Sequence, residues 1–255
     1  MYIIAGATNV GNVKKVNQDA FAAMRLETCC GEAAFAVLCD GMGGLDSGEM
    51  ASCSVVSAFK KWAINDLGSW CANGLDEKLL ENEWSIIVKE CNDKLRRFAD
   101  NKSIRLGTTA VVILLIGNRC FIMNIGDSRA YEISSAITPI TIDHTWENHM
   151  VEQGLLSAHE AHADRRRNQL TRCIGPLPDV KPDFFVGDVS ERKLYLLCSD
   201  GFRHKISPTE IWNMMHIGDS VNAADMRSSI EELIRINMER GEKDNITAIA
   251  IAVES

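Results

Sequence analysis

The chain has 255 residues, of which 46% are hydrophobic and 24% are charged, so it is long enough to bury a sizeable core. Its 27 Lys and Arg residues against 35 Asp and Glu residues give a net charge of −8, which argues against a nucleic-acid or anionic-membrane partner. No stretch approaches the roughly 20 apolar residues of a membrane span, and no signal peptide is visible, so we expect no membrane insertion. The 9 cysteines form no C-x-x-C pair, which indicates buried, reduced thiols of a cytoplasmic protein.

Short runs rich in β-branched and aromatic residues predict the strands. They lie at 2–8, 18–25, 33–39, 108–116, 119–125, 183–187, 193–198 and 246–253. Gly117-Asn118 is the expected turn between two of these runs, and we expect residues 131–133 to continue the same sheet.

Apolar residues at helical spacing predict helices at 47–64, 80–98 and 226–234. A short helix is expected at 207–215, with Ser207 as its N-cap and Pro208 at its first position. Residues 143–180 break the strand rhythm with short amphipathic pieces. Clusters of strands with long helices between them indicate an α+β fold, in which layers of sheet are covered by helices.

Four aspartates lie at the ends of separate apolar runs, namely Asp40, Asp127, Asp200 and Asp244. A carboxylate at a buried strand end is costly unless its charge is compensated. Each aspartate alone is also what an ordinary turn contains. Together, they are able to compensate one another by sharing hard cations, and oxygen-only clusters suit Mg²⁺ or Mn²⁺.

The run Asp40-Gly41-Met42-Gly43-Gly44 is expected to end a strand before a helix. Its glycines let the backbone turn and approach a ligand closely, so the Gly41 carbonyl offers another oxygen. The run lacks the lysine of a phosphate-binding P-loop, which excludes that motif. An ordinary glycine-rich turn before a helix is the alternative.

The order of these motifs resembles that of the metal-dependent serine/threonine protein phosphatases of the 2C type, in their short bacterial form. The resemblance covers nearly the whole chain. The matching stretches are Lys14-Lys15-Val16-Asn17-Gln18-Asp19, Asp40-Gly41-Met42-Gly43-Gly44, Gly107-Thr108-Thr109, Gly126-Asp127-Ser128-Arg129, Asp143-His144-Thr145, Arg167-Asn168-Gln169-Leu170-Thr171-Arg172 with Gly175, Ser199-Asp200-Gly201 and Asp244-Asn245-Ile246-Thr247.

The resemblance implies one domain over residues 1–255, built as a four-layer α-β-β-α sandwich with a central antiparallel β-sandwich flanked by helices. Residues 143–180 match the mobile flap of bacterial members. The implied activity is hydrolysis of phosphoserine and phosphothreonine monoesters by a water or hydroxide that bridges two divalent metal ions, without a covalent phospho-enzyme. The implied partners are phosphorylated proteins and a cognate serine/threonine kinase.

The resemblance also implies the roles of the site residues. Two Mn²⁺ or Mg²⁺ ions form the centre. Asp40 bridges both ions, the Gly41 carbonyl binds one, and Asp200 and Asp244 hold the other. Asp19 supports the cluster through water.

Asp127, together with Asp200, resembles the ligands of a weaker third metal. Lys14 replaces the family's arginine that grips the substrate phosphate, so it would act as a point charge where arginine would fork onto two oxygens. Gln18 replaces an acidic residue that touches metal-bound water. Asp164-Arg165 replaces a His-Pro pair of the flap.

Four alternatives stay open at this point. Lys14 is compatible with a catalytically weak phosphoprotein-binding sensor of the same fold, although the intact aspartates favour an enzyme. A two-metal nuclease shares the chemistry but is disfavoured by the acidic charge balance. His144 is either a proton donor to the leaving group or a structural residue of the flap, and Arg165-Arg166-Arg167 is either a site for an acidic partner or a solvated face.

Overall fold

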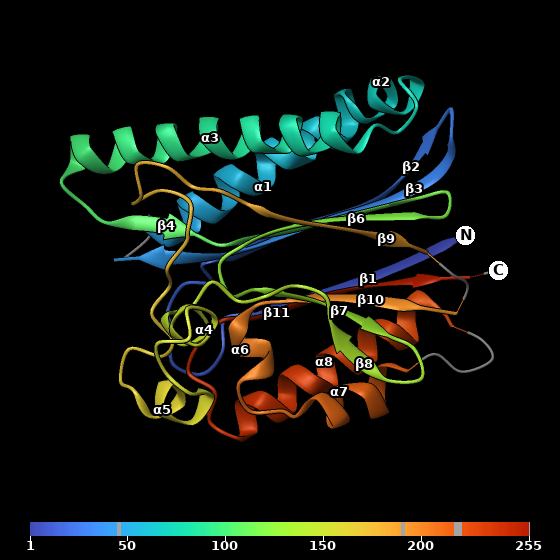
Figure 1. Ribbon diagram of the computed structural model, residues 1–255. Helices are drawn as coiled ribbons and strands as arrows, with labels where there is room; N and C mark the ends of the chain where they lie inside the picture. Colours follow the sequence, from blue (N-terminus) through green and yellow to red (C-terminus); the bar gives the residue numbers. More distant parts are fainter. Residues whose placement is uncertain (45–46, 190–191, 217–220, 255) are drawn as a thin grey trace.

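Two antiparallel sheets stack face to face at the centre of the molecule (Figure 1). The computed structural model describes residues 1–44, 47–189, 192–216 and 221–254. The first sheet has the order β1 (Tyr2–Asn9), β11 (Ile246–Val253), β10 (Leu194–Cys198), β7 (Arg129–Ile133) and β8 (Ile137–Pro139). The second has the order β2 (Asp19–Thr28), β3 (Gly31–Gly43), β5 (Ala110–Ile116), β6 (Arg119–Ile125) and β9 (Asp183–Asp188), and β4 (Leu106–Thr108) pairs with the end of β3.

Helices cover the outer face of each sheet and complete the expected α-β-β-α order (Figure 1). The second sheet is covered by α1 (Ser47–Asn65), α2 (Leu67–Ala72) and α3 (Glu77–Lys102). The first is covered by α6 (Asp200–Arg203), α7 (Pro208–Met215) and α8 (Ala223–Glu239). The flap carries α4 (Trp146–Glu152) and α5 (Ala158–Ala163), which lie at the end of the sandwich away from the chain termini. The predicted fold class is therefore confirmed.

The layered order explains why strand sequences are apolar without alternation. Every residue of β5 is buried. Its even-numbered residues pack beneath α1 and α3, and its odd-numbered residues pack between the sheets. A strand with apolar cover on both faces needs apolar residues at every position.

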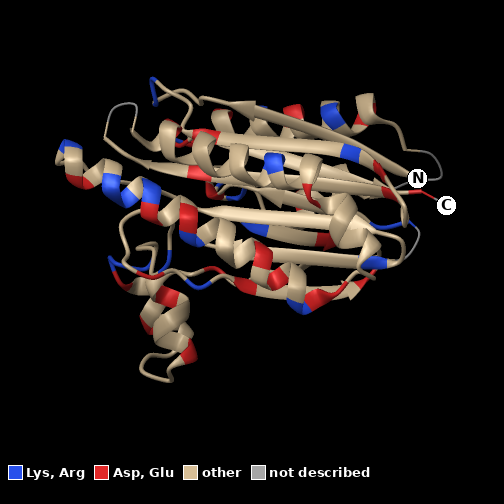
Figure 2. Ribbon diagram, turned by 90° about the horizontal axis from the view of Figure 1, so that it is seen from above, with Lys and Arg blue, Asp and Glu red and all other residues tan. Residues whose placement is uncertain are grey.

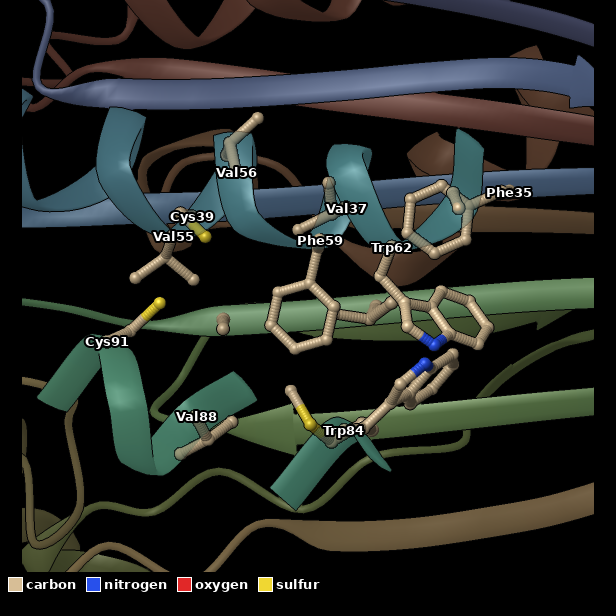
Figure 3. Close-up of a cluster of buried hydrophobic side chains, with 14 of the residues drawn as sticks. Phe35, Val37, Cys39, Val55, Val56, Phe59, Trp62, Trp84, Val88 and Cys91 are labelled. Atoms are coloured by element: carbon tan, nitrogen blue, oxygen red, sulfur yellow. The ribbon is translucent and has the colours of Figure 1, made fainter. Parts of the chain in front are cut away.

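The outer core beneath α1 and α3 is built on aromatic side chains. Phe59 and Trp62 of α1 point toward Trp84 of α3 (Figure 3). The Trp62 and Trp84 ring centroids lie 5.4 Å apart at 85°, and those of Phe59 and Trp84 lie 6.0 Å apart at 84°. Edge-to-face contacts of this kind add about 0.5–1.5 kcal/mol each beyond area burial. They fix the two long helices against the sheet that carries Asp40.

Several expected elements are confirmed and others are corrected. Ser207 caps α7 through a capping box with Glu210, and Pro208 follows it as predicted. The prediction that residues 131–133 continue the sheet of β6 was wrong, because β7 pairs with β10 in the other sheet. The run 40–44 ends β3 and precedes α1 as predicted, but the predicted strand 33–39 was too short, because β3 extends to Gly43 by pairing with β4.

The cysteines depart in part from the expectation of burial. All nine, each within the described ranges, are free thiols, but Cys29, Cys30 and Cys53 are exposed. Cys29 and Cys30 lie at the tip of the β2–β3 hairpin, where chain reversal brings the backbone to the surface.

The outer face of α3 carries acidic and basic residues mixed along its length, as Figure 2 shows from above. This distribution is that of a solvated helix face. Among the described helices, none is long and apolar enough to cross a membrane.

Candidate metal centre and substrate cleft

The aspartates predicted from the sequence meet in one cleft. The cleft has a volume of about 670 Å³, and its lining includes Asp40, Asp127, Asp200 and Asp244. It lies at the end of the sandwich that holds β4 and the flap, opposite the chain termini in Figure 1. Residues 168–170 of the flap form part of its wall.

The backbone of Asp40 is held by hydrogen bonds to Thr108 and Thr109. Its amide donates to Thr109 Oγ1 at 2.9 Å, and its carbonyl accepts from the Thr109 amide at 2.9 Å and from Thr108 Oγ1 at 2.9 Å. It also lies opposite Asp19 in the β2–β3 register. Two carboxylates that face each other across a strand pair repel one another.

Gly41 is held where only glycine fits. A Cβ at this position would lie 2.2 Å from the Gly48 carbonyl oxygen and 2.6 Å from that of Gln18. Gly201 has the same constraint, because its Cβ would lie 2.1 Å from the Asn245 carbonyl oxygen. Gly41 therefore lets the Asp40 segment pack directly against the backbone at Gln18 and Gly48, and Gly201 lets the Asp200 segment pack directly against the backbone that follows Asp244.

Two of the clustered carboxylates each keep one buried oxygen without a hydrogen-bond partner in the described part of the chain. Asp19 Oδ2 accepts from Thr247 Oγ1 at 2.6 Å, but Asp19 Oδ1 has no partner. Asp200, at the start of α6, has an unpartnered Oδ1. An unpaired buried carboxylate oxygen is costly, so these oxygens indicate a missing positive ligand.

The clustered charges shift the acidity of the site. Burial, together with the charge of Asp19 and Asp200, raises the pKa of Asp40 well above its usual range. Burial raises the pKa of Asp19 to about 7 despite its hydrogen bond from Thr247, and the charges of Asp200 and Asp244 add to the increase. Burial and the charge of Asp200 raise the pKa of Asp127 to about 7. A bound cation would remove this mutual repulsion.

Asp244 has a cationic partner of its own. Lys14 Nζ lies 2.9 Å from Asp244 Oδ1. Burial alone lowers the pKa of Lys14, but the hydrogen bond to Asp244 and the charges of Asp244 and Asp40 raise it overall. The lysine that the sequence analysis assigned to the substrate phosphate therefore lies beside a predicted metal ligand.

The donor set fits a hard cation that retains water. Within the described ranges, no three carboxylate, imidazole or thiolate side chains form a group that could hold an ion by themselves. The cleft is nevertheless lined by Asp40, Gly41 and Asp200, which have two carboxylates and a backbone carbonyl to offer an ion. Mg²⁺ and similar ions keep several waters and take only one or two carboxylates, so the rest of an ion's oxygen shell would come from solvent.

Asp127 follows the point where the chain crosses from one sheet to the other. Gly126 makes this crossing with a φ of 102°, which is a left-handed conformation that favours glycine. Arg203 Nη2 donates to the Asp127 carbonyl at 2.9 Å and to Asp143 Oδ2 at 2.8 Å. Asp127 is thus anchored through its backbone while its carboxylate stays in the cleft.

Sequence reasoning missed the polar network that fixes the base of the flap. Asp143 accepts from Arg129 Nε at 2.6 Å and from Arg129 Nη2 at 2.8 Å, in addition to Arg203. His144 is only 5% exposed, accepts from the Gly126 amide through Nδ1 at 3.1 Å and bonds Asp183 through Nε2 at 2.9 Å. Because both ring nitrogens are engaged, the geometry favours the structural role for His144.

A second missed contact connects two predicted metal ligands. His204, on the turn after Asp200, has its Nε2 3.4 Å from Asp200 Oδ2 and its Nδ1 3.5 Å from Glu242 Oε2. Glu242 Oε1 in turn accepts from the Asp244 amide at 2.9 Å. The only sequence signal is the spacing of four residues between Asp200 and His204, which places both on one side of a helical turn.

The basic run of the flap is partly tied within the flap itself. Arg166 Nη2 pairs with Asp164 Oδ2 at 3.0 Å, and its guanidinium lies 4.2 Å from the centre of the Trp146 ring. Arg167 Nη1 donates to the His162 carbonyl at 3.2 Å. These contacts favour a structural role for both arginines over a site for an acidic partner.

Comparison with known proteins identifies the family to which the chain belongs. The model of the protein phosphatase 2C family matches residues 11–249. Protein phosphatase PhpP of Streptococcus pneumoniae is 31% identical over 221 residues, which is 85% of each chain. Serine/threonine protein phosphatase PstP of Mycobacterium tuberculosis is 29% identical over 252 residues, which is 98% of this chain and 44% of PstP.

Solved structures give the same result. The serine/threonine phosphatase of S. agalactiae has a TM-score of 0.85 and 25% identity over 100% of both chains. The catalytic domain of PstP in complex with 2 manganese ions has a TM-score of 0.79 and 26% identity over 100% of both chains.

The chain belongs to the protein phosphatase 2C family. Its named relatives are protein serine/threonine phosphatases, and it is an enzyme of this class. Family membership and the manganese-bound PstP domain also support dependence on a divalent metal.

Proposed function

We propose that the protein hydrolyses phosphoserine and phosphothreonine monoesters on proteins at a centre of two Mn²⁺ or Mg²⁺ ions. Asp40 would bridge the two ions, the Gly41 carbonyl would bind one, and Asp200 and Asp244 would hold the other. Asp19 would support the cluster through water. The observation that carries the proposal is a pair of unpartnered buried oxygens in the described part of the chain: Oδ1 of Asp200, which lines the cleft with the other aspartates, and Oδ1 of Asp19, which lies opposite Asp40 in the strand register.

The side chains of the cleft indicate how the reaction is divided between protein and solvent. When bound, two divalent ions lower the pKa of a water between them and neutralise charge on the phosphoryl group. Lys14 donates to the phosphate oxygens as a point charge. Cys173 also lines the cleft, but burial and the charge of Asp127 raise its pKa to about 11, so its thiol is a poor nucleophile at neutral pH. This supports attack by water without a covalent phospho-enzyme.

The test is an assay of the purified protein with a chromogenic aryl phosphate and a phosphothreonine peptide. We expect turnover of both substrates with Mn²⁺, none after chelation, and recovery when Mn²⁺ is restored. Peptide binding without turnover in the presence of Mn²⁺ would instead support the sensor alternative. The relatives are named phosphatases, which favours the enzyme.

We further propose that residues 1–255 form one phosphatase domain with the flap at 143–180, and that it acts in cytoplasmic signalling opposite a serine/threonine kinase. The free state of all nine cysteines, each of them in the described ranges, supports a reducing compartment. The kinase is implied by the phosphorylated substrates that this class of enzyme requires.

Asp127→Ala is expected to lower turnover while leaving the two tight metals bound. Asp127 is anchored through its backbone carbonyl by Arg203, so loss of its carboxylate leaves that contact in place. We propose that this carboxylate holds a weaker third ion together with Asp200. Calorimetric titration with Mn²⁺ measures the stoichiometry of the variant, and loss of a tight site would make Asp127 a ligand of the central pair.

Asp19→Asn is expected to stabilise the metal-free protein at pH 8 but not at pH 4. The pKa of Asp19 is raised from 3.8 to about 7 in the folded state, so the folded state binds more protons than the unfolded state between these values. The carboxyl therefore costs stability progressively as pH rises through this window, and the cost is complete above about pH 7. A shift of this size corresponds to about 4 kcal/mol.

The measurement is thermal unfolding of both proteins in chelator across this pH range. The exposed Asp100→Asn variant is the control, because its charge lies on the outside of α3. Equal unfolding temperatures for Asp19→Asn and the unchanged protein at pH 8 would show that the Asp19 carboxylate is not strained by burial. In the unchanged protein, added Mn²⁺ should raise the unfolding temperature at pH 8, because a ligand that binds only the folded state stabilises it.

A further inference from the structure

The cleft contains an arginine that the site described above does not use. Arg105 lies directly before β4, its side chain is exposed, and it lines the same cleft as the aspartates. Lys14 and Arg105 are the cationic residues among the described lining of that cleft. Lys14 is already paired with Asp244 at 2.9 Å, whereas Arg105 has no ion pair or side-chain hydrogen bond within the part of the chain that the structure describes.

Arginines without a carboxylate partner are the minority in the part of the chain that the structure describes. Most of the arginines have a carboxylate partner within 4 Å in the described structure. These are Arg25, Arg96, Arg119, Arg129, Arg166, Arg172, Arg203, Arg227, Arg235 and Arg240. Arg105 therefore keeps its five N–H donors available beside a cleft that receives an anionic substrate.

The strand register sets how far Arg105 lies from the reacting phosphate. In the β3–β4 pair, Gly41 lies opposite Thr108 and Gly43 lies opposite Leu106. Arg105 is three residues from Thr108, which is about 10 Å along the strand at 3.3 Å per residue. An extended peptide covers the same distance in about three residues. Arg105 is thus placed to meet a flanking residue of the substrate and not the phosphate held at Asp40.

We propose that Arg105 is a specificity-determining residue, which binds a second anionic group of the substrate two or three residues from the phosphorylated side chain. The inference rests on the proposed function and adds the substrate class to it. A carboxylate and a phosphate present the same pair of oxygens to a guanidinium fork, so either anion satisfies the geometry.

The experiment compares kcat/KM for three phosphothreonine peptides of equal length. One has Ala at the second and third positions on both sides, one has Glu there, and one has a non-hydrolysable phosphonate residue there. We expect the unchanged protein to prefer an anionic peptide over the Ala peptide by about tenfold, the effect of one charge-assisted pair. Arg105→Ala should reduce this ratio to about one, and Arg105→Glu should invert it. The Glu and phosphonate peptides then identify the anion.

Arg97→Ala is the matched control, because Arg97 is exposed on α3 and its Nε donates to the Asp93 carbonyl within the same helix. The ratio should be unchanged in this variant. An equal ratio in Arg105→Ala and the unchanged protein would overturn the inference while leaving the phosphatase activity intact.

Absence of turnover of every peptide and of the aryl phosphate with Mn²⁺ would instead overturn the proposed function. Fluorescence anisotropy of the same labelled peptides then decides the role of Arg105 by binding. A preference for anionic peptides that Arg105→Ala removes upholds the inference, and a preference that it leaves unchanged, or no preference, overturns it.

Discussion

Asp40→Asn is expected to lower kcat by on the order of a thousandfold or more, because one carboxylate would serve both ions and their loss removes most of the electrostatic stabilisation of the phosphoryl group. The Asp40 backbone is held by Thr108 and Thr109, so the variant should keep its fold. The assay is aryl phosphate turnover at saturating Mn²⁺. Retention of more than about a tenth of the activity would contradict the bridging role.

The same substitution has an opposite expected effect on the metal-free protein. Burial, with the neighbouring charges of Asp19 and Asp200, raises the pKa of Asp40 well above its usual range, so an ionised Asp40 strains the empty cluster. Asparagine has nearly the same shape without the charge. Its unfolding temperature in chelator at pH 8 should therefore exceed that of the unchanged protein, and added Mn²⁺ should raise it less. A variant that is both inactive and unstable would indicate a damaged fold, not a lost ligand.

The elements that the sequence predicted well are those whose signal is local. The run at β5 is apolar at every position because it has cover on both faces, and the capping box at Ser207 and Glu210 marks the start of α7 within four residues. The last strand, Ile246–Val253, coincides with the predicted range. Local periodicity and end signals are sufficient in each case, since neighbouring residues alone determine them.

Sheet membership was not predictable in the same way. The sequence of residues 129–133 is compatible with a strand that pairs with β6 and with one that pairs with β10. The crossing between sheets depends on the left-handed Gly126 and on the anchoring of Asp127 by Arg203, which is 76 residues away in the sequence. The extension of β3 through Gly43 likewise depends on β4, a strand of three residues that has no periodic signal.

For the site, the sequence could name the carboxylates but not their partners. Motif order identifies Asp40, Asp200 and Asp244, because each stands at the end of a predicted strand and is followed by glycine or asparagine. The pairing of Lys14 with Asp244, and the unpartnered oxygen of Asp200, depend on side-chain positions that the folded chain alone determines. Lys14 and Asp244, for example, are more than 200 positions apart in the sequence and meet only when β1 and β11 pair.

Two roles of Lys14, binding of the substrate phosphate and neutralisation of Asp244, predict different kinetics. If it binds the substrate phosphate, Lys14→Ala should raise KM for a phosphothreonine peptide by about tenfold with little change in kcat, since a charge-assisted hydrogen bond is lost equally from the bound substrate and the transition state. Lys14→Arg should lower KM, because the guanidinium fork matches two phosphate oxygens and is less strongly hydrated than an ammonium group.

If Lys14 instead serves mainly to neutralise Asp244, its removal should change metal affinity and leave KM at saturating metal unaltered. Its 2.9 Å contact with Asp244 makes this outcome measurable, since Asp244 would be freed to bind an ion more tightly. Steady-state kinetics of both Lys14 variants, run at several Mn²⁺ concentrations, separates the two roles. Lys15→Ala is the control, because Lys15 is an exposed cation next in the chain that does not line the cleft. An unchanged KM in both Lys14 variants would show that the lysine does not touch the phosphate, and the cleft would then depend on another cation for substrate binding.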